Sequence, residues 1–368
     1  MDGKRQKKKL RSGYTTGACA AAAAKAALLT LSGQPVPAAV AIPFPDGSRH
    51  TFSLCRCLKK EDFVLASVVK DAGDDPDVTN GAEIGVELRW LAQGGEQCQE
   101  ALGTVLFVQG RGVGQVTKPG LALPVGEVAI NPVPRKMIVA ALNEAIPQAK
   151  RPGLELRVFV EHGEILAQKT LNQRLGILGG LSILGTTGIV RPISTKAWTD
   201  TIEASMAVAR AAGLAEVVLA TGRTSEAAVQ ARLGLPEEAL VMMGDYLRYA
   251  LEAAQRHGFT TIHLAAMWAK LVKAALGVPQ THVRNGALDV RDAALLLAEL
   301  GLPAQEQETM RQANTARHIY ELLCQQKRWD LITAVASRAR KQAAQWSGLA
   351  VQVYLVSAEK EVVLHVPH

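Results

Sequence analysis

The chain has 368 residues, 48% of them hydrophobic and 20% charged, which is the composition of a globular protein with room for two domains. Its lysines and arginines (41) outnumber its aspartates and glutamates (34), but residues 1–11 alone carry +5 of the net charge of +7. A nucleic-acid-binding domain needs positive charge spread over a folded face, so this distribution argues against one.

The sequence also excludes a membrane span and a disulfide framework. No uncharged apolar window reaches the roughly 20 residues that a span needs, and Lys25 interrupts the Ala-rich run 18–31 that could imitate a secretory signal. The five cysteines are odd in number and contain no Cys-x-x-Cys pair, which favours a reducing cytoplasm. Cys55 and Cys57 lie in a predicted strand without a nearby histidine or third cysteine, so we expect no protein-bound metal there.

The first half of the chain reads as one long helix followed by many short strands. Residues 18–31 predict a helix, with Thr15 or Thr16 as its N-cap and Gly33 closing it. A second helix, with proline in its first turn, is predicted at 132–146. Strands are predicted at 39–44, 49–54, 63–69, 84–91 and 104–108, and as a hairpin of 154–160 with 164–169 across Gly163. Many strands with few helices indicate an α+β domain.

The second half alternates strands and helices. After a helix at 196–212, three strand–turn–helix units are predicted, with strands at 217–220, 240–243 and 261–265. Such units imply a parallel sheet with helices on its faces, an α/β domain of Rossmann-like, three-layer type. Helices then dominate to Trp346, and 351–356 with 362–366 close the chain as a hairpin.

These patterns divide the chain into three parts. Residues 1–12 form a basic tail that we expect to be mobile, residues 13–192 the α+β domain, and residues 193–368 the α/β domain. The boundary is expected near Arg191 and Pro192. The sequence contains no internal repeat, and its low-complexity segments are the Ala-rich run and the basic tail.

Two loops near the start of the chain combine glycine with polar side chains. The stretch Gly-Tyr-Thr-Thr-Gly at 13–17 enters the first helix, where hydroxyls and backbone N–H groups make either an anion site or a plain N-cap. The loop 70–81 holds four aspartates within seven residues, but its spacing fails the EF-hand pattern. Its carboxylates therefore either accept hydrogen bonds from a ligand or cap local turns.

Two further Gly-rich stretches lie later in the first half. The stretch Gly-Arg-Gly-Val-Gly at 110–114 does not open into a helix, so we reject a dinucleotide fingerprint and expect Arg111 and Lys118 to face an anionic ligand. Arg135 and Lys136 oppose the dipole of helix 132–146, which suits carboxylate binding better than helix stability. Residues 179–192 hold four glycines within ten residues, which indicates close approach of the backbone to a ligand or to another segment.

In the second half, polar loops follow the predicted parallel strands. Residues 221–226 and the pair Gly244 and Asp245 lie where open α/β sheets bind ligands, although plain capping is the alternative. Walker A, His-Glu-x-x-His, Gly-x-Ser-x-Gly and RNA-recognition motifs do not occur. The histidines His162, His257, His263 and His282 stand apart in sequence, and we interpret them as surface or core residues.

The order of these motifs resembles the cobalt-precorrin-5B C(1)-methyltransferase family. The resemblance spans roughly residues 10 to 290 and rests on residues 11–17, 70–81, 112–121, 129–135, 185–192, 221–226, 243–246, 270–273 and 281–282. One stretch departs from the family, which tends to have His-x-Gly-Lys-Leu where this chain has Trp268, Ala269, Lys270 and Leu271 after Met267. The bulk of Trp268, and Ala269 in the place of the glycine, are expected to narrow the approach of a ligand to that backbone.

The resemblance implies methyl transfer from S-adenosylmethionine to C-1 of a cobalt-containing corrinoid precursor in the oxygen-independent cobalamin pathway. Cobalt would arrive with this tetrapyrrole substrate, and the protein itself would bind no metal. The donor is an activated sulfonium and the acceptor an electron-rich ring carbon, so the enzyme's task is alignment without a covalent nucleophile. Asp71 or Asp74 would orient the ring or accept a proton.

Under this hypothesis the two domains divide the ligands. We expect the carboxylate arms of the substrate to be held by Thr15, Thr16, Lys70, Arg111, Lys118, Asn131, Arg135, Thr186, Thr187 and Arg191. We expect the methyl donor to bind at Thr221, Gly222, Arg223, Ser225, Glu226, Gly244 and Asp245. In that site Asp245 would hydrogen-bond a ribose hydroxyl.

Two other functions stay open at this point. One is a corrinoid or anionic-ligand binding protein without catalysis, and the other is a nucleotide-dependent oxidoreductase that uses the second sheet. We expect neither nucleic acid nor a membrane as a partner. The sequence leaves open whether the chain forms a homo-oligomer and whether it associates with other enzymes of the cobalamin pathway.

Overall fold

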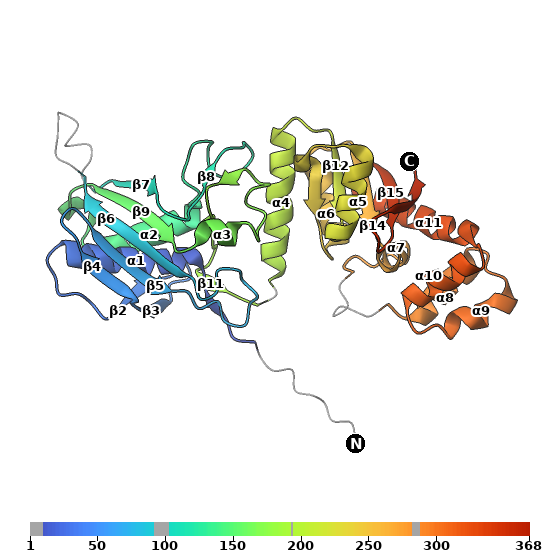
Figure 1. Ribbon diagram of the computed structural model, residues 1–368, viewed down its shortest axis with the longest axis horizontal. Helices are drawn as coiled ribbons and strands as arrows, with labels where there is room; N and C mark the ends of the chain where they lie inside the picture. Colours follow the sequence, from blue (N-terminus) through green and yellow to red (C-terminus); the bar gives the residue numbers. More distant parts are fainter. Residues whose placement is uncertain (1–9, 92–102, 193, 282–287) are drawn as a thin grey trace, which may run out of the picture. The chain divides into compact units, whose positions relative to one another are not determined.

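The computed structural model describes residues 10–91, 103–192, 194–281 and 288–368, so most of the basic tail and residue His282 lie outside the described residues. The chain divides into two compact units, Met1–Ser194 and Thr195–His368 (Figure 1). It is a mixed α/β protein, and each unit contains a sheet with both parallel and antiparallel pairs.

Helix α1 (Thr16–Leu31) forms the centre of the first unit. It begins where the hydroxyl of Thr15 accepts a hydrogen bond from Ala18 N (3.2 Å) and ends at Ser32. Eight alanines of this helix are fully buried, which is possible because small side chains let neighbouring elements approach on several sides. Helix α2 (Pro132–Ala145) and the first sheet pack directly against it.

The first sheet is built from five strands, most of them antiparallel. Its order is β4 (Arg56–Lys59), β5 (Val64–Val69), β6 (Glu83–Trp90), β9 (Leu154–Val160) and β7 (Val105–Gln109), with β7 parallel to β9. Three two-stranded ladders complete the unit: β2 (Ala39–Pro43) with β3 (Arg49–Ser53), β1 (Gly13–Tyr14) with β11 (Ile189–Val190), and β8 (Gln115–Val116) with β10 (Ile177–Leu178). A 3₁₀ turn, Gln148–Lys150, precedes β9.

The predicted hairpin across Gly163 is wrong, because residues 163–167 form the short helix α3 (Gly163–Ala167). Both edges of β9 are already paired, with β6 on one side and β7 on the other, so no edge remains for a second hairpin strand. The carboxylate of Glu164 instead accepts a hydrogen bond from Gly112 N at 2.7 Å and holds α3 against that loop.

The second sheet has the order β13 (Leu240–Met242), β12 (Glu216–Ala220), β14 (Thr261–Ala266), β15 (Ala350–Val356) and β16 (Val362–Val366). The first four strands are parallel and β16 is antiparallel, so the three predicted strand–turn–helix units and the closing hairpin are confirmed. The parallel strands are buried over most of their length, as a sheet covered on both faces requires.

Helices cover both faces of this sheet. Helix α5 (Arg223–Leu233) packs on one face against Val218, Ala220 and Tyr354. The other face carries the larger core, to which α4 (Thr195–Ala211), α6 (Leu247–Arg256), α7 (Trp268–Ala275) and α11 (Trp329–Ser347) contribute. The remaining helices are α8 (Val290–Glu299), α9 (Ala304–Arg311), α10 (Ala316–Gln325) and the 3₁₀ turn Glu237–Ala239.

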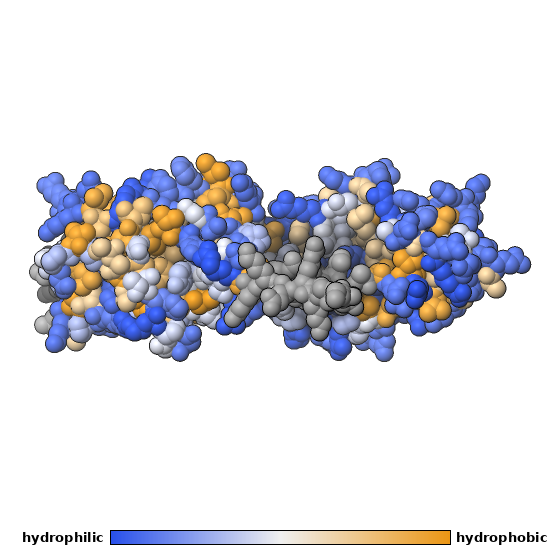
Figure 2. All heavy atoms as spheres, turned by 90° about the horizontal axis from the view of Figure 1, so that it is seen from below, coloured by the Kyte–Doolittle hydropathy of each residue, from blue (hydrophilic) through white to orange (hydrophobic). Residues whose placement is uncertain are grey.

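The surface of both units carries apolar side chains among polar ones. Large exposed apolar residues include Val78 and Ile165 in the first unit and Trp198 and Met267 in the second. The face in Figure 2 likewise shows hydrophobic patches between hydrophilic residues on each unit. Within the described residues, no helix is both long enough and apolar enough to cross a bilayer.

We predict that Glu144→Gln lowers the stability of the first unit in a pH-dependent way. Hydrogen bonds from Arg49 are the largest cause that lowers the pKa of Glu144 to about 2. Partial burial acts against this shift, and the hydrogen bond and charge of Lys25 add to it. Because the unfolded value is about 4.3, the contribution of Glu144 is present above about pH 4.3 and is lost as the pH falls through about 2. Melting temperatures of the wild type and the variant should therefore converge on acidification.

The matched control for this series is Glu252→Gln, which removes an exposed pair with Arg248 on α6. It should change the melting temperature little at any pH, since such surface pairs contribute about 0–1 kcal/mol. A wild-type advantage over Glu144→Gln that stayed constant from neutral to strongly acidic pH would contradict this role of Glu144.

Candidate functional site

Four of the loops singled out in the sequence meet around the N-terminal end of α1. Tyr14 N donates to the carbonyl of Asp71 at 2.7 Å, and Thr15 N donates to the carbonyl of Gly188 at 2.9 Å. Leu184 accepts from Gly17 N, and Ile183 accepts from Asn131 N. The stretches 11–17, 71–74, 131–135 and 181–191 therefore form one cluster, although they are far apart in sequence.

The glycines of these loops make room for backbone. A Cβ at Gly13 would lie 2.3 Å from Gly73 N, and a Cβ at Gly185 would lie 2.6 Å from the side chain of Thr15. The same holds at Gly112, where a Cβ would stand 2.1 Å from the carbonyl oxygen of Val160. For Gly185, which belongs to the Gly-rich stretch 179–192, the close neighbour is another chain segment.

The two threonines at the start of α1 use their hydroxyls inside the fold. Thr15 caps the helix, and the hydroxyl of Thr16 exchanges two hydrogen bonds of 3.0 Å with the backbone of Leu184. The N–H groups of Gly17 and Ala18 are also satisfied, by Leu184 and Thr15. These bonds agree with the plain N-cap alternative, and Thr15 and Thr16 as substrate ligands stay a prediction.

Lys70 is a buried anchor of the acidic loop. Its side chain is 1% exposed, and its ammonium binds the carboxylate of Asp77 and the hydroxyl of Thr79 (2.5 Å). Although burial acts to raise the pKa of Asp77, the charge and hydrogen bond of Lys70 hold it below its usual value. Lys70 thus neutralises the loop from beneath, where a substrate arm would not reach it.

The two candidate catalytic carboxylates, Asp71 and Asp74, face Arg11. Arg11 forms a bidentate ion pair with Asp71, and its backbone N donates to the carboxylate of Asp74 at 2.7 Å. The hydrogen bond from Arg11, with one from Gly73 N, lowers the pKa of Asp71. A carboxylate with a lowered pKa is a weak base, so the arrangement suits orientation better than proton abstraction.

The cationic residues predicted to bind the substrate differ in how many hydrogen bonds and ion pairs they already make within the protein. Arg135 donates to Glu127 at 2.7 Å and to the Ile130 and Val128 carbonyls, and Lys118 donates to the Arg174 carbonyl at 3.2 Å. Arg111 is 58% exposed and lies 3.3 Å from Glu161. Arg191, Thr186 and Thr187 are exposed beside β11.

Extension of the β1–β11 register places Arg191 opposite Ser12, next to Arg11. Arg11 and Arg191 therefore lie at one edge of the cluster around α1. Arg111 and Lys118 belong to other parts of the unit, and the side chain of Arg135, at the end of the stretch 131–135, bonds to residues 127–130. The structure thus does not gather all predicted substrate residues into one site.

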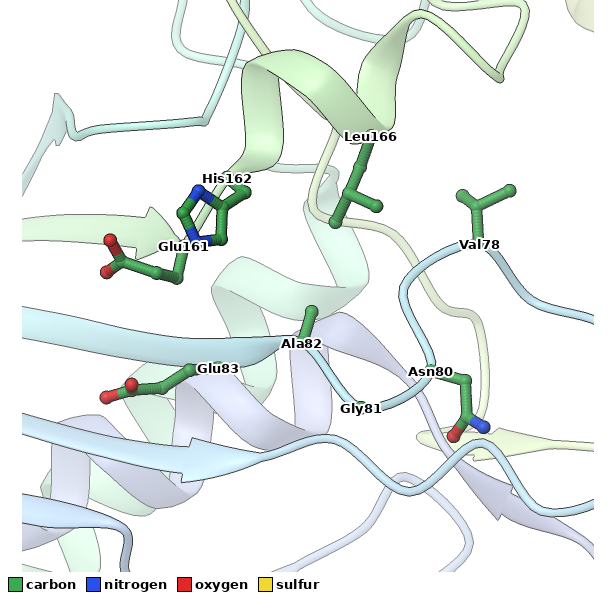
Figure 3. A pocket seen from close by; sticks show the side chains of 8 residues that line it. All are labelled: Val78, Asn80, Gly81, Ala82, Glu83, Glu161, His162 and Leu166. Carbon is green, nitrogen blue, oxygen red and sulfur yellow. The ribbon is translucent and has the colours of Figure 1, made fainter.

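A cavity of about 360 Å³ lies between the acidic loop and the end of β9 (Figure 3). Val78, Ala82 and Leu166 give it an apolar side, while Glu83, Glu161 and His162 give it a polar one. Glu83 accepts from Arg56 Nε at 2.5 Å, and Glu161 lies 3.3 Å from Arg111 and 3.7 Å from Arg56. The two carboxylates of the cavity are therefore balanced by two guanidinium groups.

Sequence reasoning set His162 aside, yet the structure places it at this cavity. The residue is exposed and has φ of 57°, a left-handed conformation that is uncommon outside glycine. No periodic pattern marks such a position, because the residues opposite it come from residues 78–83, far away in the chain. The Gly163 that follows His162 was the available local signal for an irregular backbone.

In the second unit, three loops come together at the carboxyl ends of β12, β13 and β14. The register pairs Ala220 with Met242 and with Ala265, so the loops that follow these strands leave the same sheet edge. Gly222 begins α5 without a side-chain cap, and Ser225 bonds locally to Thr221 and to the Gly222 carbonyl, each at 3.2 Å. Both Arg223 and the buried Glu226 lie in the first turn of α5.

Asp245 belongs to a polar cluster at this edge. Its carboxylate binds the ammonium of Lys270 and accepts from the hydroxyl of Thr281 at 2.9 Å. Lys270 and Lys273 both donate to the carbonyl of Thr281, at 3.1 and 2.8 Å. Burial lowers the pKa of Lys273, and repulsion from the ammonium of Lys270 lowers it further. The attraction of the Asp245 carboxylate acts in the opposite direction.

Two tryptophans of the second unit are placed by the structure. Trp198 was not predicted as a site residue, and Trp268 was expected beside a ligand. Gly244 has φ of 57°, and a Cβ there would lie 3.2 Å from the ring of Trp198, which is 42% exposed. Trp268 is only 5% exposed and packs 5.4 Å from the ring of Tyr320 in the core. Trp268 is therefore a buried residue that contacts Tyr320, and the expected narrowing by Trp268 and Ala269 stays a prediction.

Comparison with known proteins gives consistent names. Models of the CbiD family match residues 3–192, and models of the CbiD C-terminal domain match residues 280–367. The chain is 53% identical to cobalt-precorrin-5B C(1)-methyltransferase of Desulfotalea psychrophila, covering 98% of this chain and 99% of that protein. It is 47% identical to the protein of the same name from Geobacter sp. strain M21, covering 92% of each.

Among solved structures, the chain is similar to a cobalamin biosynthesis protein (cbiD) from Archaeoglobus fulgidus, with 28% sequence identity and a TM-score of 0.39. The match covers 72% of this chain and 79% of that one.

We predict that Asp77→Asn destabilises the first unit more than Lys70→Met does. Loss of the Asp77 charge leaves an ammonium that is 1% exposed without its counter-ion, and breaking a buried pair in this way costs about 3–5 kcal/mol. Lys70→Met leaves a carboxylate that is 22% exposed and still bonded to Thr79, so the loss is smaller. Denaturant unfolding measures both, and the reverse order would contradict the role of Lys70 as a buried anchor.

Proposed function

The chain belongs to the CbiD family, and we propose that it catalyses transfer of a methyl group to C-1 of cobalt-precorrin-5B. The observation that carries this proposal is similarity over nearly the full length to proteins that bear this activity as their name. Cobalt belongs to the substrate in this proposal, and S-adenosylmethionine is the methyl donor. The free thiols of Cys19, Cys55, Cys57 and Cys324 support a reducing cytoplasmic setting.

We place the corrinoid on the first unit. The substrate is a macrocycle fringed with carboxylates, and Arg111 and Arg191 offer exposed guanidinium groups to such arms. Charge-assisted hydrogen bonds of this kind contribute about 1.5–3 kcal/mol each. Arg11, held at the surface by Asp71 and Asp74, adds a third cation near Arg191.

We place the methyl donor at the carboxyl edge of the second sheet. From β12 the chain first adds β13 on one side and then β14 on the other, so the strand order reverses between β12 and β14. Helix α5 packs on one face of the sheet and α7 on the other, and doubly wound sheets bind nucleotides at the carboxyl ends of the strands beside such a switch point. This strand order with helices on both faces supports the Rossmann-like, three-layer description.

In this site Asp245 and Lys270 act together. The carboxylate of Asp245 holds the ammonium of Lys270 at the sheet edge, beside the glycine turn at Gly244. A ribose hydroxyl can donate to such a carboxylate, and the carboxylate of the donor's amino-acid part can accept from such an ammonium. Thr221, Gly222 and Arg223 line the neighbouring loop after β12.

The chemistry assigned to this chain is alignment. The sulfonium of the donor is already an electrophile, and the ring carbon supplies the electron pair that forms the new bond as the carbon–sulfur bond breaks. Holding the two in line can supply about 7–11 kcal/mol of the barrier reduction. Asp71 and Asp74 contribute by fixing Arg11 against the loop cluster, since the low pKa of Asp71 makes it a poor proton acceptor.

We predict that Asp245→Asn weakens binding of S-adenosylmethionine by on the order of tenfold or more, the loss expected for one charge-assisted contact of about 1.5–3 kcal/mol. Binding of the corrinoid should be unchanged, because the substrate is assigned to the first unit. Titration calorimetry with each ligand measures both constants, and Glu252→Gln on α6 is the matched surface control. An unaltered affinity for the donor would remove Asp245 from the site.

The reaction itself is tested by anaerobic incubation of the protein with cobalt-precorrin-5B and methyl-labelled donor. We expect the mass of the corrinoid to increase by one labelled methyl group. If both ligands bind and the corrinoid mass stays unchanged, the chain is a corrinoid-binding protein without catalysis. Binding of a nicotinamide nucleotide in place of the donor would instead favour the oxidoreductase alternative.

A further inference from the structure

The cavity beside the acidic loop combines an apolar side with a charge-balanced polar side. Ala82 and Leu166 lie along the middle of the cavity, while Glu83 and Glu161 extend toward the same side and His162 stands next to Glu161 (Figure 3). Arg56 and Arg111 neutralise the two carboxylates. Because its carboxylates are already paired, such a surface suits the apolar face of a large ring better than it suits a lone anion.

His162 is held in a strained conformation by its surroundings. Its φ of 57° belongs to the left-handed region, and the backbone of Gly163 after it packs against Gly112, where a Cβ on Gly163 would be 2.2 Å from the Gly112 carbonyl oxygen. Glu164 bonds to Gly112 N from the next position. A non-glycine residue persists in such a conformation where the surrounding structure enforces it, and such outliers cluster at functional sites.

The imidazole of His162 has no hydrogen bond, ion pair or ring contact with any residue that the structure describes. Five other histidines differ in this respect, because His50, His257, His263, His318 and His365 each bond through a ring nitrogen. The ring is exposed at the cavity, so its nitrogens are accessible to a ligand.

We propose that His162 binds the cobalt of the corrinoid substrate as an axial ligand. This inference rests on the proposed function, which supplies a cobalt-containing macrocycle. Imidazole nitrogen is a common ligand for first-row transition metals, and the charge-balanced lining of the cavity leaves the imidazole as its uncharged donor. The apolar side of the cavity, with Ala82 and Leu166, would lie against the face of the ring.

The step is a ligand exchange without a redox change. The lone pair of one imidazole nitrogen forms a bond to cobalt, and the water that occupied that axial position leaves. No bond to carbon forms or breaks, so His162 is a positioning residue with respect to methyl transfer. Because one face of the macrocycle is then bound at the cavity, only the opposite face is left open to the methyl donor.

Electron paramagnetic resonance of cobalt(II) tests this coordination directly. The wild-type protein is loaded anaerobically with cobalt-precorrin-5B in the cobalt(II) form, and the axial nitrogen should split the cobalt lines. Protein grown with nitrogen-15 histidine should show a changed splitting, which identifies the nitrogen as one from histidine.

Two variants remove the ligand while keeping the backbone. Asparagine and glycine both tolerate the left-handed conformation, so His162→Asn and His162→Gly should fold, and melting curves check this. Both should lose the nitrogen splitting, and added imidazole should restore it in His162→Gly. His368→Ala, at the exposed C-terminal residue, is the control that should keep the wild-type spectrum.

The results separate this inference from the proposed function. A wild-type protein that methylates the corrinoid without nitrogen splitting, or variants that keep the splitting, would overturn axial ligation and leave the methyltransferase intact. A wild-type protein that shows the histidine splitting but transfers no methyl group would overturn the proposed function and leave the coordination standing. If His162 positions the ring, its variants should also raise KM for the corrinoid more than they raise KM for the donor.

Discussion

The close approach of backbones around the N-terminal end of α1 is the constraint on which the first unit depends. Eight alanines of α1 are fully buried, and because their side chains are small, α2 and the sheet can pack close to the backbone of this helix. At its N-terminal end, Gly13, Gly73 and Gly185 let four loops hydrogen-bond to one another without side chains between them. A larger residue at Gly13 or Gly73 would clash with backbone, which cannot move aside as a flexible side chain can.

This packing decides which charges are available to a ligand. Lys70 is buried under the acidic loop, where its ammonium neutralises Asp77. The hydroxyl of Thr16 bonds to the backbone of Leu184, and the hydroxyl of Thr15 accepts from the backbone N–H of Ala18 at the start of α1. Such groups fix the shape of the loop that borders the cavity through Val78. Arg11, Arg111 and Arg191 are exposed, and their planar, permanently charged groups match carboxylate geometry.

Much of the secondary structure could be predicted from the sequence, because hydrophobic period and turn residues are local signals. Helices α1, α2 and α4 begin and end within two residues of the predicted bounds. The error at 164–169 arose because the pairing of β9 with two other strands is not encoded locally. Donor residues near Gly222 and Asp245 could be proposed from the sheet rule, whereas the partners of Asp245, Lys270 and Thr281, are set by tertiary packing.

The cavity residues show why less of the candidate site than of the fold could be predicted from the sequence. His162 carries no motif, and its importance follows from a backbone angle and from neighbours that come from residues 78–83. Under the proposed function the two sites also constrain each other, since reacting atoms must come within about 3–3.5 Å for direct transfer. A corrinoid bound by one axial face at His162 presents only its other face to the methyl donor, so the face that His162 takes limits the direction from which the donor can react.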